Sequence, residues 1–216
     1  MKILITGANG FVGLNVIKAL VAARHQVTAY VRASSNVSFL ESFDVTLVRG
    51  ELHDSQRLQA AMAGHDGVIH TAGNTSSNAR DWPLLEAVNV EGTRSVIEAA
   101  LACGVSRLVY TSTSSTIGAH NDPAAEATEK TALAGFRAKN PYAKSKLLAE
   151  ELVYRACDRG LSAVILNPTE VLGAYDYSMQ WGRMVLAVNY NQLPFLPPGA
   201  PVFAARAMSV TRTSAP

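Results

Sequence analysis

The feature that most constrains the fold is a set of three glycines at three-residue intervals, directly after a short apolar segment. Residues 2–6, Lys-Ile-Leu-Ile-Thr, predict a buried strand, and residues 11–23 predict an amphipathic helix. Between them, Gly7 allows a tight turn, Gly10 allows a phosphate to approach the backbone, and Gly13 allows the helix to pack closely on the strand. The pattern therefore predicts a strand–loop–helix unit whose helix N-terminus binds an anion.

Apolar runs alternate with amphipathic segments along most of the chain, as they do in a parallel sheet covered by helices. The further predicted strands are 26–32, 45–48, 67–71, 107–111 and 162–166, and the further predicted helices are 55–63, 84–103, 142–159 and 180–189. Ser55 is the candidate N-cap of the helix that it begins. No strand is predicted after residue 190. We therefore predict an α/β fold with a Rossmann-type, doubly wound parallel sheet in a three-layer αβα arrangement.

Composition excludes several classes of function. The formal net charge is only +2, which argues against a nucleic-acid-binding surface. No apolar stretch is long enough for a membrane span, and the start of the chain does not have the pattern of a signal peptide. Cys103 and Cys157 lie far apart, and no spacing of His, Cys, Asp or Glu suggests a metal site. We expect a cytoplasmic protein with reduced thiols and no bound metal.

The segment after the second predicted strand bears on the choice of dinucleotide. Chains that bind NAD usually carry an acidic residue there, which binds the ribose 2′-hydroxyl. Residues 30–35 read Tyr-Val-Arg-Ala-Ser-Ser and contain no acid. Arg32 is suited to pair with the 2′-phosphate of NADP, although it could also be a solvated surface residue. The sequence favours NADP, with NAD as the alternative.

Tyr142 and Lys146 are four residues apart at the start of a predicted helix, and so lie on one helical face. A free phenol has a pKa near ~10 and is a poor base at neutral pH. A neighbouring ammonium lowers that pKa, so that the phenol can exchange a proton with an alcohol or ketone oxygen. A run of hydroxyl residues at 111–116 could bind the same oxygen, or could serve only in hydrogen bonds at the strand end.

These motifs together resemble the extended short-chain dehydrogenase/reductase family, also described as the NAD-dependent epimerase/dehydratase superfamily, over about residues 1–200. The Val-Arg at 31–32 and the Leu-Asn-Pro at 166–168 are similar to dihydroflavonol-4-reductase-like members. The resemblance implies that Thr113 is the catalytic hydroxyl, with Ser112 as its close rival, and that Asn89 supports the backbone of the active site. A helix-surface position for Asn89 is the other interpretation. His70, in an apolar strand, is expected to be a packed core residue.

The resemblance also implies a set of residues that contact the dinucleotide, with Glu51 near the adenine and the turn after residue 166 near the nicotinamide. Those residues are Gly7, Asn9, Gly10, Phe11, Val12, Gly13, Arg32, Glu51, Leu52, Thr71, Ala72, Gly73, Tyr142, Lys146, Asn167, Pro168 and Thr169.

From this resemblance we expect a dinucleotide-binding domain over residues 1–175 and a partial, irregular remnant of a substrate lobe over residues 176–216, most of the lobe being absent. The expected function is NADP-dependent hydride transfer to or from a secondary alcohol or ketone of a small-molecule substrate. The alternatives are a sugar-nucleotide epimerase or dehydratase with bound NAD, and a C-terminally short cofactor-binding protein with little activity. A homodimer through helices 84–103 and 142–159 is also expected.

Overall fold

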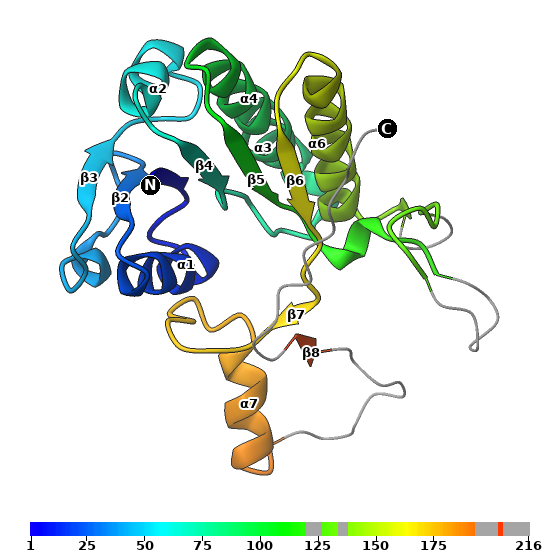
Figure 1. The fold of residues 1–216 in the computed structure, drawn as a ribbon. Coiled ribbons are helices and arrows are strands. Elements are labelled where there is room, and N and C mark those ends of the chain that lie inside the picture. Colours follow the sequence, from blue (N-terminus) through cyan, green and yellow to red (C-terminus); the bar gives the residue numbers. More distant parts are fainter. Residues whose placement is uncertain (120–126, 134–137, 193–202, 205–216) are drawn as a thin grey trace.

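The computed structural model describes residues 1–119, 127–133, 138–192 and 203–204 of the 216-residue chain. Its centre is a six-stranded parallel sheet with the strand order β3-β2-β1-β4-β5-β6 (Figure 1). The strands are β1 (Lys2–Thr6), β2 (Gln26–Val31), β3 (Thr46–Arg49), β4 (Gly67–His70), β5 (Arg107–Thr111) and β6 (Ala163–Leu166). This is the order of a doubly wound Rossmann sheet, in which the direction of winding reverses at β1. The predicted fold class is therefore confirmed.

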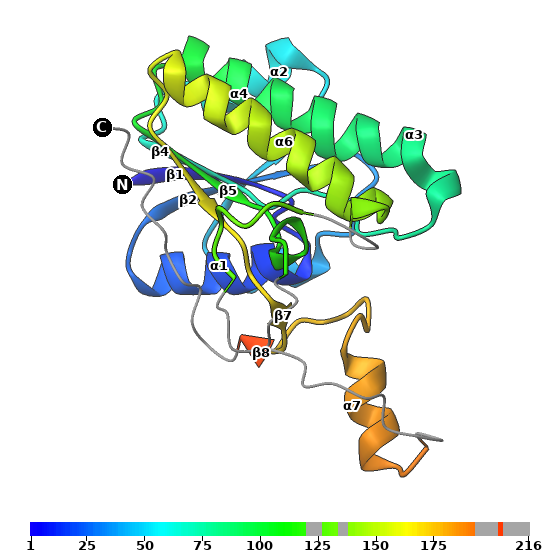
Figure 2. The ribbon, with the colours of Figure 1, turned by 90° about the vertical axis from the view of Figure 1, so that its right-hand side faces the viewer.

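Helices cover both faces of the sheet and make three layers (Figure 2). One face carries α1 (Phe11–Ala22), and the other carries α2 (Ser55–Met62), α3 (Trp82–Leu85), α4 (Gly92–Ala102) and α6 (Pro141–Asp158). A π-helical segment, η3 (Glu86–Glu91), joins α3 to α4 without a break. The single helix predicted over 84–103 is thus a composite of three segments. Three short 3₁₀ turns complete this part of the fold: η1 (Ser38–Leu40), η2 (Ala79–Asp81) and η4 (Ser114–Thr116).

Successive residues of each strand point to opposite faces of the sheet, so one strand contributes to two cores. In β1, Ile3 and Ile5 belong to the apolar cluster beneath α1, together with Leu14 and Ile17 of that helix. Leu4 belongs to the second cluster, which α2, α4 and α6 cover. The continuous apolar runs of the sequence reflect burial on both faces, as expected for a parallel sheet.

Asp54, not Ser55, caps helix α2. The Oδ1 atom of Asp54 accepts a hydrogen bond from the backbone N–H of Arg57 at 3.0 Å, while Ser55 is the first residue inside the helix. Aspartate and serine are almost equally good caps, so a sequence in which they are adjacent does not distinguish between them. The expectation for Ser55 was wrong by one position.

Beyond β6 the chain leaves the sheet and forms a separate, smaller group of elements (Figures 1 and 2). β7 (Glu170–Val171) pairs in parallel with β8 (Phe203–Ala204), and α7 (Gly182–Asn189) projects away from the main sheet. The expectation of no strand after residue 190 was therefore wrong. Within the described residues, every helix is too short or too polar to cross a lipid bilayer.

Gly7 and Gly13 each allow two backbone segments to lie unusually close together at the carboxyl end of the sheet. Gly7 has a φ of +68°, and a Cβ atom there would lie 2.5 Å from the backbone nitrogen of Ala72. A Cβ atom on Gly13 would overlap the carbonyl oxygen of Gly7 and lie 2.9 Å from the Cα of Ala8. Side chains at these positions would push α1 away from β1, and the loop after β4 away from the glycine loop.

We expect Gly13→Ala to destabilise the fold by about 1–3 kcal/mol, because the added methyl group meets backbone atoms that cannot rotate away. The measurement is the free energy of unfolding from urea denaturation. Gly173→Ala is the matched control, since a Cβ atom there would make only an ordinary contact, 3.8 Å from the ring of Phe11. Equal stability of the two variants would show that the close approach at Gly13 carries no energetic weight.

Candidate functional site

The glycine loop ends at an open helix N-terminus. Gly10, the N-cap of α1, has extended backbone angles and no side chain with which to cap the helix. Its N–H donates to the carbonyl oxygen of Gly7 at 3.0 Å, which folds the loop back on itself. The N–H groups of the first turn of a helix lack intrahelical partners and attract an anion. The loop therefore has the geometry that a bound phosphate needs.

A hollow of about 550 Å³ begins at this loop and follows the carboxyl ends of β1 to β4. Its size is typical of sites for small molecules. Of the residues expected to contact the dinucleotide, it is lined by Gly7, Asn9, Gly10, Arg32, Glu51, Leu52, Thr71, Ala72 and Gly73. Phe11, Val12 and Gly13 belong to the first turn of α1 and do not line the hollow. Leu84, Ala87 and Val88 add an apolar wall that the sequence reasoning did not include.

Arg32 and Ser35 lie at the end of the hollow formed by the loop after β2. The Arg32 side chain is exposed, and no carboxylate in the described part of the chain forms a salt bridge with it. Arg49, at the end of β3, donates hydrogen bonds to the carbonyl oxygens of Ala33 at 2.7 Å and Ser35 at 3.2 Å, and so braces this loop. The Ser35 hydroxyl is buried without a hydrogen-bond partner among the described residues. A buried hydroxyl without a partner and a guanidinium without a salt bridge, both among the described residues that line this end of the hollow, suit an anionic group.

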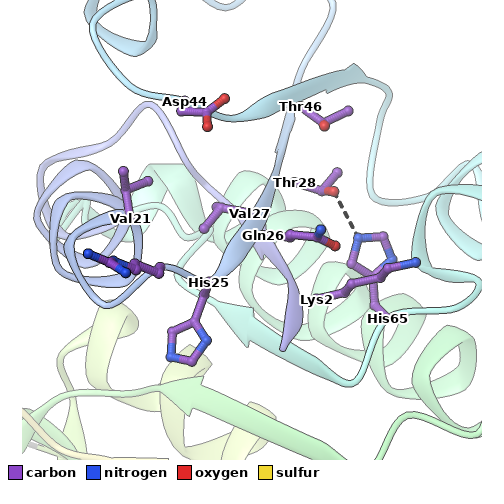
Figure 3. Close-up of a pocket in the computed structure, with 10 residues that line it drawn as sticks. Lys2, Val21, His25, Gln26, Val27, Thr28, Asp44, Thr46 and His65 are labelled. Carbon is purple, nitrogen blue, oxygen red and sulfur yellow. Dashed lines mark hydrogen bonds between the residues drawn. The ribbon is translucent and has the colours of Figure 1, made fainter.

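A second hollow, of about 740 Å³, lies at the opposite, amino-terminal end of β1 to β3. Figure 3 shows His65, whose Nε2 atom lies 2.8 Å from Thr28 Oγ1, while the side chain of His25 points away from both. The charged groups around it, among them Lys2 and Asp44, do not converge on one point (Figure 3). Ligands of doubly wound sheets bind at the carboxyl ends of the strands, so the smaller hollow is the candidate site.

Tyr142 and Thr113 meet at this same carboxyl edge. Asn140 caps α6 by accepting a hydrogen bond from the Tyr142 N–H at 2.9 Å, which fixes Tyr142 in the first turn. Burial raises the pKa of the Tyr142 phenol, a side-chain hydrogen bond with Thr113 acts in the opposite direction, and the charge of Glu170 raises it further. The pKa is thus raised, not lowered as expected from a neighbouring ammonium, because burial has the largest effect. The phenol is protonated at neutral pH and lies against the Thr113 hydroxyl.

Ser112, the rival of Thr113, faces a different partner. Its hydroxyl donates a short hydrogen bond to the Glu150 carboxylate, inside the protein and away from the phenol. Ser112 is 4% exposed. The structure thus separates two adjacent residues that the sequence could not distinguish. Of the two, only Thr113 interacts with the phenol of Tyr142.

Lys146 lies one turn after Tyr142 and is fully enclosed. Its Nζ atom donates to the carbonyl oxygen of Thr111 at 2.7 Å and lies 4.3 Å from the centre of the Tyr110 ring. Burial lowers the pKa of the ammonium group to about 7, although the charge of Glu150 acts to raise it. Lys144, by contrast, is exposed and packs over the Trp82 ring at 4.6 Å.

Asn89 connects the loop after β4 to the helix that carries Tyr142. Its Oδ1 atom accepts from the Asn74 N–H at 2.7 Å, and its Nδ2 atom donates to Ser145 Oγ at 2.8 Å. Ser145 in turn donates to the carbonyl oxygen of Tyr142 at 2.8 Å. Because Asn89 is only 1% exposed, the helix-surface interpretation was wrong.

His70 is a core residue, as expected, and it also belongs to a buried polar chain. Its Nε2 atom lies 3.0 Å from Thr93 Oγ1, and its Nδ1 atom lies 2.6 Å from Thr6 Oγ1. Thr93 donates its one hydroxyl hydrogen to the carbonyl oxygen of Asn89, so its oxygen must accept from Nε2–H. Burial, and then the charge of Lys146, lower the pKa of His70 to about 3, which keeps the ring neutral in this arrangement.

The turn after β6 packs against the loop that carries Thr113. Asn167 Nδ2 donates to the carbonyl oxygen of Thr113 at 3.1 Å, and the carbonyl oxygen of Pro168 accepts from the Ser114 N–H at 2.9 Å. Thr169 is half-buried. None of these three residues lines the 550 Å³ hollow. Asn167 and Pro168 instead contact the loop that carries Thr113.

The sequence reasoning missed Ser35 and Glu150. Ser35 stands three residues after Arg32, within residues 30–35, where the prediction depended only on acidic and basic side chains. Glu150 stands four residues after Lys146 and eight after Tyr142, on the same helical face, and this spacing was the available signal.

A family model described as "NAD dependent epimerase/dehydratase family" matches residues 3–199. Among curated proteins, the chain is 32% identical over 201 residues to "Sterol demethylase protein B" of Methylococcus capsulatus, a match that covers 93% of this chain and 61% of the relative. It is 34% identical to "Putative dihydroflavonol 4-reductase" of Synechocystis, and this match covers 88% of this chain and 55% of the relative. It is 36% identical to "2-alkyl-3-oxoalkanoate reductase" of Stenotrophomonas maltophilia, and this match covers 83% of this chain and 53% of the relative.

Solved structures show the same likeness. The crystal structure of gox2253 matches with a TM-score of 0.79 and 31% identity, over 89% of this chain and 58% of the other. MoeE5 in complex with UDP-glucose and NAD matches with a TM-score of 0.72 and 26% identity, over 87% and 60%. The chain therefore spans only about 53–61% of the length of these curated relatives and solved structures. By the extent of the family match and by its identity to these relatives, the chain belongs to the NAD-dependent epimerase/dehydratase family.

Proposed function

We propose that this chain belongs to an NADP-dependent oxidoreductase that transfers hydride to or from a secondary alcohol or ketone. The observation that carries the proposal is the contact between the Tyr142 phenol and the Thr113 hydroxyl, one helical turn from buried Lys146. This group shares the carboxyl edge of the sheet with the glycine loop and the 550 Å³ hollow. A proton donor and a phosphate-binding loop are thus available to one bound dinucleotide and one substrate.

When bound in the hollow, NADP would supply or accept the hydride at the substrate carbon. Tyr142 and Thr113 donate hydrogen bonds to the substrate oxygen, and Tyr142 gives it a proton as a ketone is reduced. The raised pKa of Tyr142 keeps the phenol protonated, which suits this direction. Lys146, when protonated, would stabilise the phenolate that forms, and it would donate hydrogen bonds to the hydroxyls of the nicotinamide ribose.

NADP is the proposed dinucleotide because of the groups at the end of β2. Arg32 has a guanidinium free of salt bridges within the described chain, and the buried Ser35 hydroxyl has no partner there. A 2′-phosphate would provide acceptor oxygens for both groups, whereas the 2′-hydroxyl of NAD would leave the guanidinium without an anion. Glu51, which follows the neighbouring strand β3 and also lines the hollow, is the residue proposed to lie near the adenine.

A sugar-nucleotide epimerase or dehydratase is the second candidate, favoured by the likeness to MoeE5, which was solved with UDP-glucose and NAD. The two candidates differ in their use of the dinucleotide. An oxidoreductase consumes one NADPH for each ketone reduced, whereas an epimerase regenerates its cofactor in each cycle. Absorbance at the reduced nicotinamide band, with a panel of ketones and of UDP-sugars, tests the proposal. Conversion of a UDP-sugar without net loss of NADPH would overturn it.

We expect Arg32→Ala to weaken NADPH binding by about tenfold or more, and NADH binding by less than about threefold, because a charge-assisted hydrogen bond is lost only with NADPH. Fluorescence titration of each cofactor measures both affinities. Arg155→Ala is the control, since Arg155 is an exposed arginine on α6, away from the hollow. Similar losses for the two cofactors would contradict the NADP assignment.

We expect Thr113→Ala to lower kcat for ketone reduction by about a hundredfold, because it removes a donor aimed at the substrate oxygen. Ser112→Ala should lower kcat by less than about tenfold and should mainly reduce stability, because it removes a donor to the buried Glu150 carboxylate. Steady-state kinetics and thermal unfolding of both variants make the comparison. A larger loss of kcat in Ser112→Ala would reverse the two assignments.

A further inference from the structure

Glu150 is a buried carboxylate in the middle of α6, and only 6% of it is exposed. A carboxylate removed from water is costly unless hydrogen bonds and an opposite charge compensate it. Both kinds of compensation surround this residue, and both involve the proposed active site.

The hydrogen bonds join Glu150 to three segments that are distant in sequence. Its Oε1 atom accepts from the hydroxyl of Ser112 after β5, from the hydroxyl of Thr116 in η4, and from the side-chain amide of Asn167 after β6. The Thr116 and Asn167 contacts are each 2.8 Å long. One oxygen atom thus holds the segments on both sides of Thr113 against α6.

The opposite charge is that of Lys146, which lies one turn earlier on the same helix, and whose ammonium charge Glu150 favours. Among the residues that the structure describes, the other titratable groups around this lysine carry no negative charge at neutral pH. They are His70 of β4, whose pKa is lowered to about 3, Tyr110 of β5, and Tyr142 of α6, the last two with pKa values raised by burial. Tyr154 lies on the side of Glu150 nearer the end of α6, and burial raises its pKa as well.

We propose that Glu150 is a positioning residue: its carboxylate fastens the ends of β5 and β6 to α6, and it keeps the ammonium charge on buried Lys146. Thr113 is then held against Tyr142 by a group that touches neither substrate nor dinucleotide. This inference rests on the proposed function only in the roles given to Lys146 and Thr113, because the charge compensation itself is a property of the folded chain.

The test is Glu150→Gln, which retains the shape and one acceptor oxygen but removes the charge. In protein labelled with [¹³Cε]lysine, NMR titration follows the ionisation of Lys146 directly, and its signal is identified by its loss in Lys146→Met. The midpoint should move from about 7 to a lower pH, by about one unit, as is typical for loss of a neighbouring opposite charge. Glu151→Gln is the matched control, since Glu151 is the exposed neighbour on the same helix and its midpoint should not move.

Catalysis provides a second readout that simple structural damage would not reproduce. Above both midpoints, a one-unit shift leaves about a tenfold smaller protonated fraction of Lys146. Glu150→Gln should therefore lose about tenfold in kcat at pH 8 relative to the parent, but only about twofold or less near pH 5.5. A loss of the same size at both pH values, or an unmoved NMR midpoint, would overturn the inference.

The two readouts separate failure of the inference from failure of the proposed function. A midpoint that moves in a chain that reduces no ketone supports the role of Glu150 and counts against hydride transfer. Ketone reduction with an unmoved midpoint supports hydride transfer and overturns the role of Glu150.

If Glu150→Gln folds poorly, the double variant Lys146→Met/Glu150→Gln decides the matter. Removing one of two opposite charges that are buried on the same helix face is more damaging than removing both. The double variant should therefore recover at least half of the loss in Tm or in soluble yield. Losses that simply add would show that the two charges do not compensate each other.

Discussion

The close packing of the first loop against its surroundings is the constraint on which the rest of this structure depends. α1 reaches β1 only because Gly13 has no side chain, and the loop after β4 reaches the glycine loop only because Gly7 has none. These two approaches set the depth of the hollow at the carboxyl edge and the direction of the open helix N-terminus. The sheet beneath supplies rigidity, since β1 lies between β2 and β4 and has an apolar core on each face.

Buried polar groups extend this constraint across the sheet. Thr6, the last residue of β1, contacts His70, which contacts Thr93, which donates to Asn89, which in turn contacts Ser145 of α6. The strand that leads into the glycine loop and the helix of Tyr142 are therefore joined by consecutive hydrogen bonds. A second group around Glu150 does the same for the ends of β5 and β6. Apolar packing alone allows one element to slide slightly over another. A chain of hydrogen bonds between buried side chains does not allow this, because each donor must stay aligned with its acceptor.

Local pattern accounts for the parts of the fold that could be predicted. The apolar runs located all six strands of the main sheet to within one residue or so. In the strands inside the sheet, burial on both faces leaves a run of β-branched and aliphatic residues, whereas the edge strand β3 is exposed or half-buried along its length. β8 was missed because two residues form no pattern and pair only with a distant strand. The six-residue π segment η3 was missed because its apolar spacing is close to that of an ordinary helix.

The candidate site was predictable in its motifs but not in its contacts. Gly7, Arg32, Tyr142 and Lys146 stand at spacings that imply chemistry by themselves. The choice between Ser112 and Thr113 depends on which way two adjacent side chains point, and that depends on Glu150, which is 34 to 38 residues away from the hydroxyls it binds. A single glutamate in a helix is usually a surface residue, so its burial could be seen only in three dimensions.

The π segment η3 has a consequence for how this helix could change. A π turn holds one more residue than an α turn, and such turns are frequent at functional sites. If residues 86–91 closed to a regular α-helix without losing a residue, everything before them would rotate by about 100° relative to everything after them. Leu85, now fully buried, would leave the core, or else Thr93 and the buried histidine would part. The π turn therefore determines which face each half of the helix presents to the core. Deletion of one residue there should therefore be better tolerated than deletion of one residue within the regular turns of α4, because only the π turn holds an extra residue.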